Sequence, residues 1–166
     1  QLNQNKYPAQ AIHRIDYETS GLVLFCKHPF FQAYCDKNME EHHIKKEYIA
    51  LVQDHTNYKN KKIISNIARD RHNAKKMIIH PNGKESVSIF NTLKNYKDCS
   101  LIQVTILTGR KHQIRVQCAS LNHPILNDPL YGGKKIDNTG LLLQSHHIQF
   151  NDVDITCPQE KRFIRK

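Results

Sequence analysis

Three short segments of the chain carry residue types that can do chemistry and that a hydrophobic core does not need. The first is HRID, which ends in Asp16 and is followed by YETSG. The second is KEY, which ends in Tyr48, and the third is TGRKHQIR, residues 108–115. Together they offer a carboxylate able to act as a nucleophile or a base, a phenol, and a cluster of positive charges.

Asp16 raises the first question because it precedes GLVLFCK, an apolar run that predicts a strand covered on both faces. Aspartate is a poor strand residue, and burying its charge is unfavourable unless the charge is paired. Taken alone, Asp16 is more simply a turn or capping residue. Its role therefore depends on what surrounds it.

The elements that must position these segments are mostly strands. Pro29 and the helical spacing of the apolar residues after it predict a helix over 29–42, and RKHQIRVQCASLN predicts a second one. Alternating or continuous apolar runs predict strands in KKEYIALVQ, KIISNIA, KKMIIH, ESVSIFNTLKNY, CSLIQVTILTG, GLLLQSHHIQF and VDIT. The pattern predicts an α+β fold in one domain, residues 1–166, with no repeat and no second domain.

The charge balance favours an anionic partner. The chain has 25 lysine and arginine residues against 15 aspartate and glutamate residues, a formal net charge of +10. Such an excess attracts polyanions, and nucleic acid is the favoured partner because phosphate contacts dominate its affinity for proteins. The alternative is a merely solubilising surface. The basic segment RDRHNAKK, which contains Arg69 and Arg71, fits a phosphate contact and a solvated loop equally well.

Cysteine usage and hydropathy bear on the compartment. The five cysteines are odd in number and form no C-x-x-C pair, which predicts free thiols in a reducing environment. No apolar run approaches the roughly 18 residues of a membrane helix, and the start lacks the layout of a signal peptide. Adjacent histidines at 42–43 and 146–147 do not share a helix face, so we expect no metal site. These features predict a cytoplasmic protein without membrane contact, and a monomer is the default expectation.

The three segments resemble a known family when they are taken in order. HRID-x-x-TSG, KEYIALV and TGRKHQIR-x-Q-x-A-x-x-x-HPI-x-x-D-x-x-YGG are similar to motifs of the RluA-type pseudouridine synthases. The resemblance extends from residue 11 to about residue 150, and its first and third motifs are long. It implies a mixed, mainly antiparallel bent sheet with flanking helices and an RNA-binding cleft. It also implies isomerisation of uridine to pseudouridine in ribosomal or transfer RNA, without a cofactor or a metal.

The resemblance assigns roles to individual residues. The catalytic aspartate of the family corresponds to Asp16, its active-site tyrosine to Tyr48, and the basic partner of the aspartate to Arg115. Arg14 would hold the phosphate of a flipped-out nucleotide or fill the space that it leaves. The residues expected to position RNA or brace the fold, rather than to do chemistry, are Arg110, Lys111, His112 and Gln113, with Arg69 and Arg71 as further phosphate contacts.

Elementary chemistry agrees with these roles. An aspartate is ionised at neutral pH in water, and a neighbouring arginine favours the charged form and holds its rotamer. The carboxylate of Asp16 can then attack the sugar or remove a proton from it. Tyr48 offers a flat face for a base and a phenol for proton transfer. Within the three motifs, catalysis is a better interpretation of Asp16 than a turn.

Two departures from the family pattern leave alternatives open. Asn122 and Asn127 stand where the family usually has glycine, and asparagine tolerates a positive φ well. The family domain normally begins with further strands ahead of HR-x-D, so we expect the chain to lack them, together with any S4-type module. That expectation supports one alternative, a non-catalytic RNA-binding module. A metal-dependent nuclease using Asp16, Asp70 and Asp128 is a weaker one, because these residues are far apart in sequence.

Overall fold

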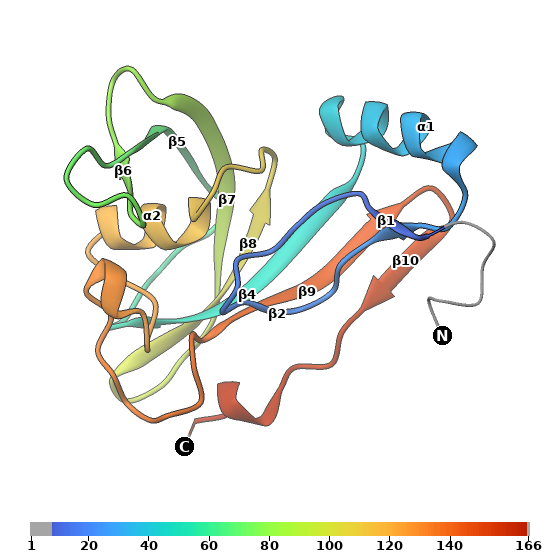
Figure 1. The fold of residues 1–166 in the computed structure, drawn as a ribbon. Coiled ribbons are helices and arrows are strands. Elements are labelled where there is room, and N and C mark those ends of the chain that lie inside the picture. Colours follow the sequence, from blue (N-terminus) through green and yellow to red (C-terminus); the bar gives the residue numbers. More distant parts are fainter. Residues whose placement is uncertain (1–7, 166) are drawn as a thin grey trace.

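The structure, a computed structural model, describes residues 8–165 and is organised around one eight-stranded sheet (Figure 1). The strand order is β10-β9-β4-β8-β7-β5-β6, and β2 pairs with β9 beside this path. All pairings are antiparallel except β2 with β9. The strands are β1 (Gln10–Ala11), β2 (Ser20–Gly21), β3 (Phe25–Cys26), β4 (Lys45–Gln53), β5 (Lys61–Arg69), β6 (Met77–Ile79), β7 (Lys84–Asn95), β8 (Cys99–Ile106), β9 (Leu143–Phe150) and β10 (Val153–Thr156).

Two α-helices, α1 (Pro29–Glu40) and α2 (Gln113–Ser120), lie over opposite ends of the sheet (Figure 1). Pro29 occupies the first turn of α1, where its missing N–H is not needed. Short 3₁₀ turns follow at η2 (Pro129–Tyr131) and η3 (Lys161–Phe163). The predicted helices and the mainly antiparallel α+β architecture are confirmed.

The main core lies at the centre of the sheet, where β4 and β8 are neighbours. Residues 49–52 of β4 are all buried, and Phe90, Ile102 and Val104 on the next strands have no exposed surface. A strand covered on both faces needs apolar residues at consecutive positions, and this requirement explains the unbroken run IALV in β4. A second cluster joins α1 to β3 and β9 through Cys35, Cys26, Ile44, Ile148 and Phe150.

The prediction of one buried strand over GLVLFCK is wrong. The segment forms two pieces of strand, β2 and β3, with residues 22–24 between them outside any strand. Gly21, the last residue of β2, has φ of 103°, and β3 pairs with β1. Leu22 and Leu24 still pack against the second cluster. The apolar run is therefore only half-buried at residues 22–24, and Cys26 is its one buried residue.

The cysteines, two asparagines and the helices were also the subject of expectations from the sequence. All five cysteines are free thiols, and four of them are buried. Asn122 and Asn127 both have φ of 62°, so asparagine occupies the left-handed conformation where relatives were expected to use glycine. Within residues 8–165, none of the helices has the length and apolar character to cross a membrane.

Candidate active site

A cleft of about 710 Å³ opens between the end of α1, the β8–α2 loop and one face of β4. Asp16 and Tyr48 both line this cleft, together with Arg14 from the first motif and residues 109–114 from the third. Segments that are up to about a hundred positions apart therefore meet around one cavity. Asp16 and Tyr48, two of the three residues assigned to chemistry, line it. The third, Arg115, has its Nη1 3.8 Å from Asp16 Oδ2.

Strand β9 brings the first two motifs together. Ser145 of β9 pairs with Tyr48 of β4 on one side and with Gly21 of β2 on the other. A Cβ on Gly21 would lie 2.2 Å from the Ser145 carbonyl oxygen, so only glycine allows this close approach. The pairing of β4 with β9 also shifts register between Glu47 and Tyr48. Such bulges often re-aim a side chain beside an active site.

Tyr48 is held in a largely water-free position. Only 6% of its surface is exposed, and burial raises the pKa of its phenol to about 12, with the Asp16 carboxylate adding to the rise. The hydroxyl therefore keeps its proton at neutral pH. In this state Tyr48 can donate a hydrogen bond and present its ring to a base.

Arg115 connects the catalytic candidate Asp16 to the protein interior. Its Nε and Nη2 donate hydrogen bonds to the two carboxylate oxygens of Asp128, at 2.7 and 2.8 Å, while Nη1 lies 3.8 Å from Asp16 Oδ2. Nη2 also lies 3.5 Å from Glu18. Burial alone would lower the pKa of Arg115, but Asp128, followed by Asp16 and Glu18, raises it above its ordinary value. The guanidinium is thus permanently charged beside Asp16.

The expected pairing of Arg115 with Asp16 is present, but the sequence interpretation missed the closer partner. Asp128 is fully buried, and its bidentate pair fixes the plane of the guanidinium. Asp128 belongs to the D-x-x-YGG part of the third motif, which was the available signal. Both carboxylate oxygens of Asp128 accept hydrogen bonds from Arg115. Asp70 lies after β5, in the β5–β6 loop. The geometry therefore gives no support to a nuclease centre built on Asp16, Asp70 and Asp128.

Gln113 braces the loop that precedes α2. Its Oε1 accepts hydrogen bonds from Thr108 Oγ1 at 2.8 Å and from the Arg110 N–H at 3.0 Å. Its Nε2 donates to the Val87 carbonyl at 3.1 Å and to Ser88 Oγ at 2.8 Å. The buried amide is engaged inside the protein at both ends, which fits the bracing role that the sequence allowed for this residue.

His112 lines the cleft and is anchored from behind. It adopts a left-handed conformation with φ of 53°, and its Nδ1 lies 2.8 Å from the hydroxyl of Tyr131. That hydroxyl also accepts a hydrogen bond from the Met77 N–H at 2.8 Å. Burial, only partly offset by Asp16, lowers the pKa of His112. A neutral histidine is therefore held at the N-terminus of α2.

The remaining basic candidates fall into two neighbouring groups. Arg14, Arg110 and Lys111 line the main cleft, and the last two also line a shallower groove of about 470 Å³ that includes Arg69. Arg71 is exposed in the β5–β6 loop and lines neither cavity. Together the two cavities, which share Arg110 and Lys111, are the basic surface of this site, and Arg71 lies outside it.

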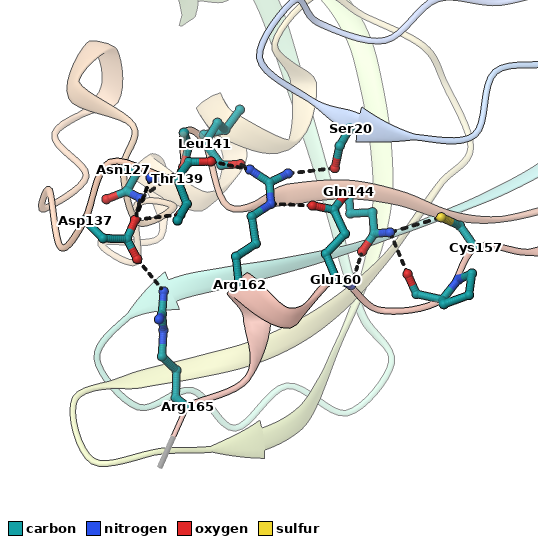
Figure 2. A network of polar contacts seen from close by, with 12 residues as sticks. Ser20, Asn127, Asp137, Thr139, Leu141, Gln144, Cys157, Glu160, Arg162 and Arg165 are labelled. Atoms are coloured by element: carbon teal, nitrogen blue, oxygen red, sulfur yellow. Dashed lines mark hydrogen bonds and ion pairs between the residues drawn. The ribbon is translucent and has the colours of Figure 1, made fainter.

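The C-terminal segment is hydrogen-bonded to the start of β2 (Figure 2). Arg162 Nη2 donates to Ser20 Oγ at 2.7 Å, and Nη1 donates to the carbonyl oxygens of Thr139 and Leu141 at 2.7 and 3.1 Å. Its Nε pairs with Glu160 at 2.6 Å. One guanidinium therefore joins the TSG part of the first motif to two later segments of the chain.

The fold places the chain among α+β proteins that carry a basic cleft on a largely antiparallel sheet. The RNA pseudouridylate synthase family matches residues 1–120, and the chain belongs to this family. The resemblance expected from the three motifs is confirmed by relatives that include ribosomal large subunit pseudouridine synthases C and D.

Three curated relatives illustrate the similarity. An uncharacterized RNA pseudouridine synthase of Bacillus subtilis (strain 168) is 37% identical over 135 residues, which are 80% of this chain and 45% of that protein. Ribosomal large subunit pseudouridine synthase C of Buchnera aphidicola subsp. Baizongia pistaciae is 39% identical over 137 residues, covering 80% and 42%. Ribosomal large subunit pseudouridine synthase D of Borreliella burgdorferi is 32% identical over 168 residues, covering 98% and 50%. The chain thus spans about half the length of these relatives.

Solved structures show the same fold. Human RNA pseudouridylate synthase domain containing 1 superposes with a TM-score of 0.83 at 24% identity, over 91% of this chain and 69% of that one. Human RNA pseudouridylate synthase domain containing 4 superposes with a TM-score of 0.78 at 18% identity, over 94% and 73%. At these identities the superpositions bear on the fold alone.

Proposed function

We propose that the chain is the catalytic part of an RNA pseudouridine synthase that isomerises uridine to pseudouridine in ribosomal or transfer RNA. The observation that carries the proposal is the position of Asp16. In a member of this family its carboxylate lines a basic cleft beside Tyr48 and lies 3.8 Å from a permanently charged guanidinium. The names of the relatives favour ribosomal RNA as the substrate.

The reaction needs little from the protein besides a carboxylate and a shaped cavity. The N1–C1′ bond of uridine breaks, the uracil turns, and C5 joins C1′ while C5 loses a proton and N1 gains one. Atoms and electrons balance within the nucleoside, so no co-reactant is consumed. Asp16 acts on the sugar as a nucleophile or a base, and Arg115 places a positive charge 3.8 Å from its carboxylate and restricts its orientation.

The target nucleotide must leave its helix to reach such a cleft. A base that is stacked within RNA cannot approach a carboxylate inside a cleft, so we infer that the nucleotide is flipped out. The ring of Tyr48 receives the uracil, and Arg14 holds the nucleotide's phosphate or replaces it in the stack. Arg110, Lys111 and Arg69 carry the flanking backbone along the basic surface, where phosphate contacts supply affinity without base specificity.

Asp16→Asn tests the proposal directly. The substrate is transcribed ribosomal or transfer RNA that carries tritium at C5 of uridine, because pseudouridine formation releases this tritium to water. The unmodified chain should release tritium, and the Asp16→Asn chain should bind the same RNA without release. Release at the normal rate by the variant would overturn the assignment of Asp16.

A second outcome separates the two functions that the sequence left open. If the unmodified chain binds RNA tightly but releases no tritium from ribosomal or transfer RNA, it is a binding module that keeps the synthase fold.

The five free thiols support the reducing cytoplasm as the place where the protein works. The monomeric state stays a prediction.

A further inference from the structure

Lys46 is a buried ammonium group for which the reaction described above has no use. It lies two residues before Tyr48 on the same face of β4, lines the same cleft, and is only 6% exposed. Among the described residues, the one hydrogen bond of its Nζ is to the thioether sulfur of Met39 in α1, at 3.1 Å. A thioether is a weak acceptor, so most of the donor capacity of the ammonium is unused.

The comparison with Arg115 shows how unusual this arrangement is. Both cations are at least nine-tenths buried, but Arg115 faces three carboxylates, whereas no ion pair among residues 8–165 involves Lys46. Burial lowers the pKa of Lys46, which means that the folded protein disfavours its charge. A buried charge without a partner destabilises a fold, and an anionic ligand that enters the cleft would supply that partner.

His13 shows that the positive charge of Lys46 reaches other groups around the cleft. His13 also lines the cleft, and its Nε2 accepts a hydrogen bond from the Leu24 N–H at 3.1 Å. Burial and then the charge of Lys46 lower the pKa of His13 to about 4, while a backbone contact with Arg14 opposes them in part. The imidazole is therefore neutral at neutral pH. It does not compensate the positive charge of Lys46, which can attract a negative ligand.

We propose that Lys46 is the anion subsite of the cleft and binds a phosphodiester of the RNA next to the target nucleotide. Residues two apart on a strand are separated by about 7 Å along it, so a nucleotide whose base meets Tyr48 brings its backbone within reach of Lys46. The neighbouring cations Arg14, Arg110 and Lys111 raise the potential for the same anion. The proposal rests on the proposed function and adds a specific backbone contact to it.

Lys46→Met tests the subsite because it removes the charge and keeps an unbranched side chain. The probe is a short synthetic RNA hairpin with uridine in its loop, and binding is measured between about 50 and 200 mM salt. We expect about tenfold weaker binding and a slope of log K against log salt that is smaller in magnitude by about 0.7, the value for one single-strand phosphate contact. Lys46→Arg should keep the slope of the unmodified chain.

Lys45→Met is the matched control, since it removes the same charge from the next residue. Lys45 is exposed and pairs with Glu47 at 3.0 Å, outside the cleft. Its replacement should leave the slope unchanged. Thermal melting distinguishes an RNA contact from a purely structural lysine, because replacing a structural lysine would lower the melting temperature. Lys46→Met should melt at the same or a higher temperature than the unmodified chain, because an unpaired buried charge is gone.

Neutral linkages in the RNA test the same contact without altering the protein. Methylphosphonate is introduced at each loop linkage in turn. At one linkage it should weaken binding by the unmodified chain about tenfold and have no further effect on Lys46→Met. Equal effects on both chains at every linkage, an unchanged salt slope in Lys46→Met, or no binding of the hairpin by the unmodified chain would each overturn the subsite.

The tritium assay distinguishes failure of the Lys46 subsite from failure of the proposed function. Tritium release by the unmodified chain, combined with equal methylphosphonate effects on both chains, rejects the subsite alone. A linkage-specific effect without any tritium release rejects the catalytic function and retains Lys46 as an RNA contact.

Discussion

Arg115 is held by Asp128 and points at Asp16. Two hydrogen bonds of 2.7 and 2.8 Å engage Nε and Nη2 with the buried carboxylate of Asp128, and the remaining nitrogen, Nη1, lies 3.8 Å from Asp16. The two acidic residues therefore have different parts in one arrangement. Asp128 orients the guanidinium, and Asp16, whose side chain is 22% exposed, faces the cleft.

Asp128→Ala should be among the most destabilising substitutions in the chain. It leaves the Arg115 charge buried without its bidentate partner, and breaking a buried pair in this way costs about 3–5 kcal/mol. Urea denaturation followed by circular dichroism measures the loss. A change below about 1 kcal/mol would mean that Asp16 and Glu18 suffice to hold Arg115.

Asp16→Asn should show the opposite balance of effects. The partly exposed carboxylate makes only a long contact with Arg115, so the free energy of unfolding should change by less than about 1 kcal/mol. Pseudouridine formation should fall by about 10⁴-fold or more, as for the loss of a nucleophile or base. Denaturation and tritium release on the same preparation check both expectations. Strong destabilisation together with residual activity would contradict them.

Arg115→Lys keeps the charge but not the geometry. A single ammonium cannot make two parallel bonds to Asp128 and also approach Asp16. Because a displacement of about 1 Å in a catalytic group lowers rates about 100-fold, we expect a decrease of that size in kcat with little change in KM for RNA. Single-turnover tritium release measures the step. An unchanged kcat would show that charge alone is required at this position.

Arg162→Met should weaken the connection between the C-terminal segment and β2, because it removes the hydrogen bond to Ser20 (Figure 2). The substitution leaves the carbonyls of Thr139 and Leu141 without this donor and Glu160 without its cation. We expect a loss of about 2 kcal/mol, measured by urea denaturation. Arg165→Met is the control, because the Arg165–Asp137 pair of 3.3 Å lies nearer the surface and should contribute less than about 1 kcal/mol. Equal losses in the two variants would contradict the special role of Arg162.

His13 should make the protein less stable as the pH falls from about 6.5 to about 4. Burial and Lys46 lower the pKa of His13 from 6.5 to about 4, so in this range the unfolded chain binds a proton that the folded chain rejects. Stability then decreases with falling pH, by up to about 1.4 kcal/mol per pH unit from this group. His13→Gln keeps an acceptor for the Leu24 N–H and should flatten the dependence. Parallel curves for the two proteins in urea denaturation at several pH values would contradict the expectation.

The sequence by itself determined the elements with strong periodicity and the identity of the motifs. The run KKEYIALVQ became β4 because its apolar positions are the buried ones. The helix predicted after Pro29 formed as α1, but Phe30, Phe31 and Tyr34 are exposed, and the helix buries Cys35 and Asn38 instead.

Asp16 and Arg115 stand in the two long motifs, and Tyr48 was assigned from the shorter motif KEYIALV that lies between them in order. GLVLFCK was wrongly predicted as one strand because apolar content does not reveal which strand each backbone group pairs with: β2 pairs with β9 and β3 with β1.

Only the tertiary structure decided how the charges are partnered. That Arg115 binds Asp128 more closely than Asp16, and that Lys46 is buried without a carboxylate, depends on contacts between segments far apart in the chain. Electrostatic free energy varies with distance and burial, and neither is encoded locally. A sequence pattern can therefore name the charged residues of this site, but the packing of β4, β9 and α2 determines which of them are satisfied and which are left for a ligand.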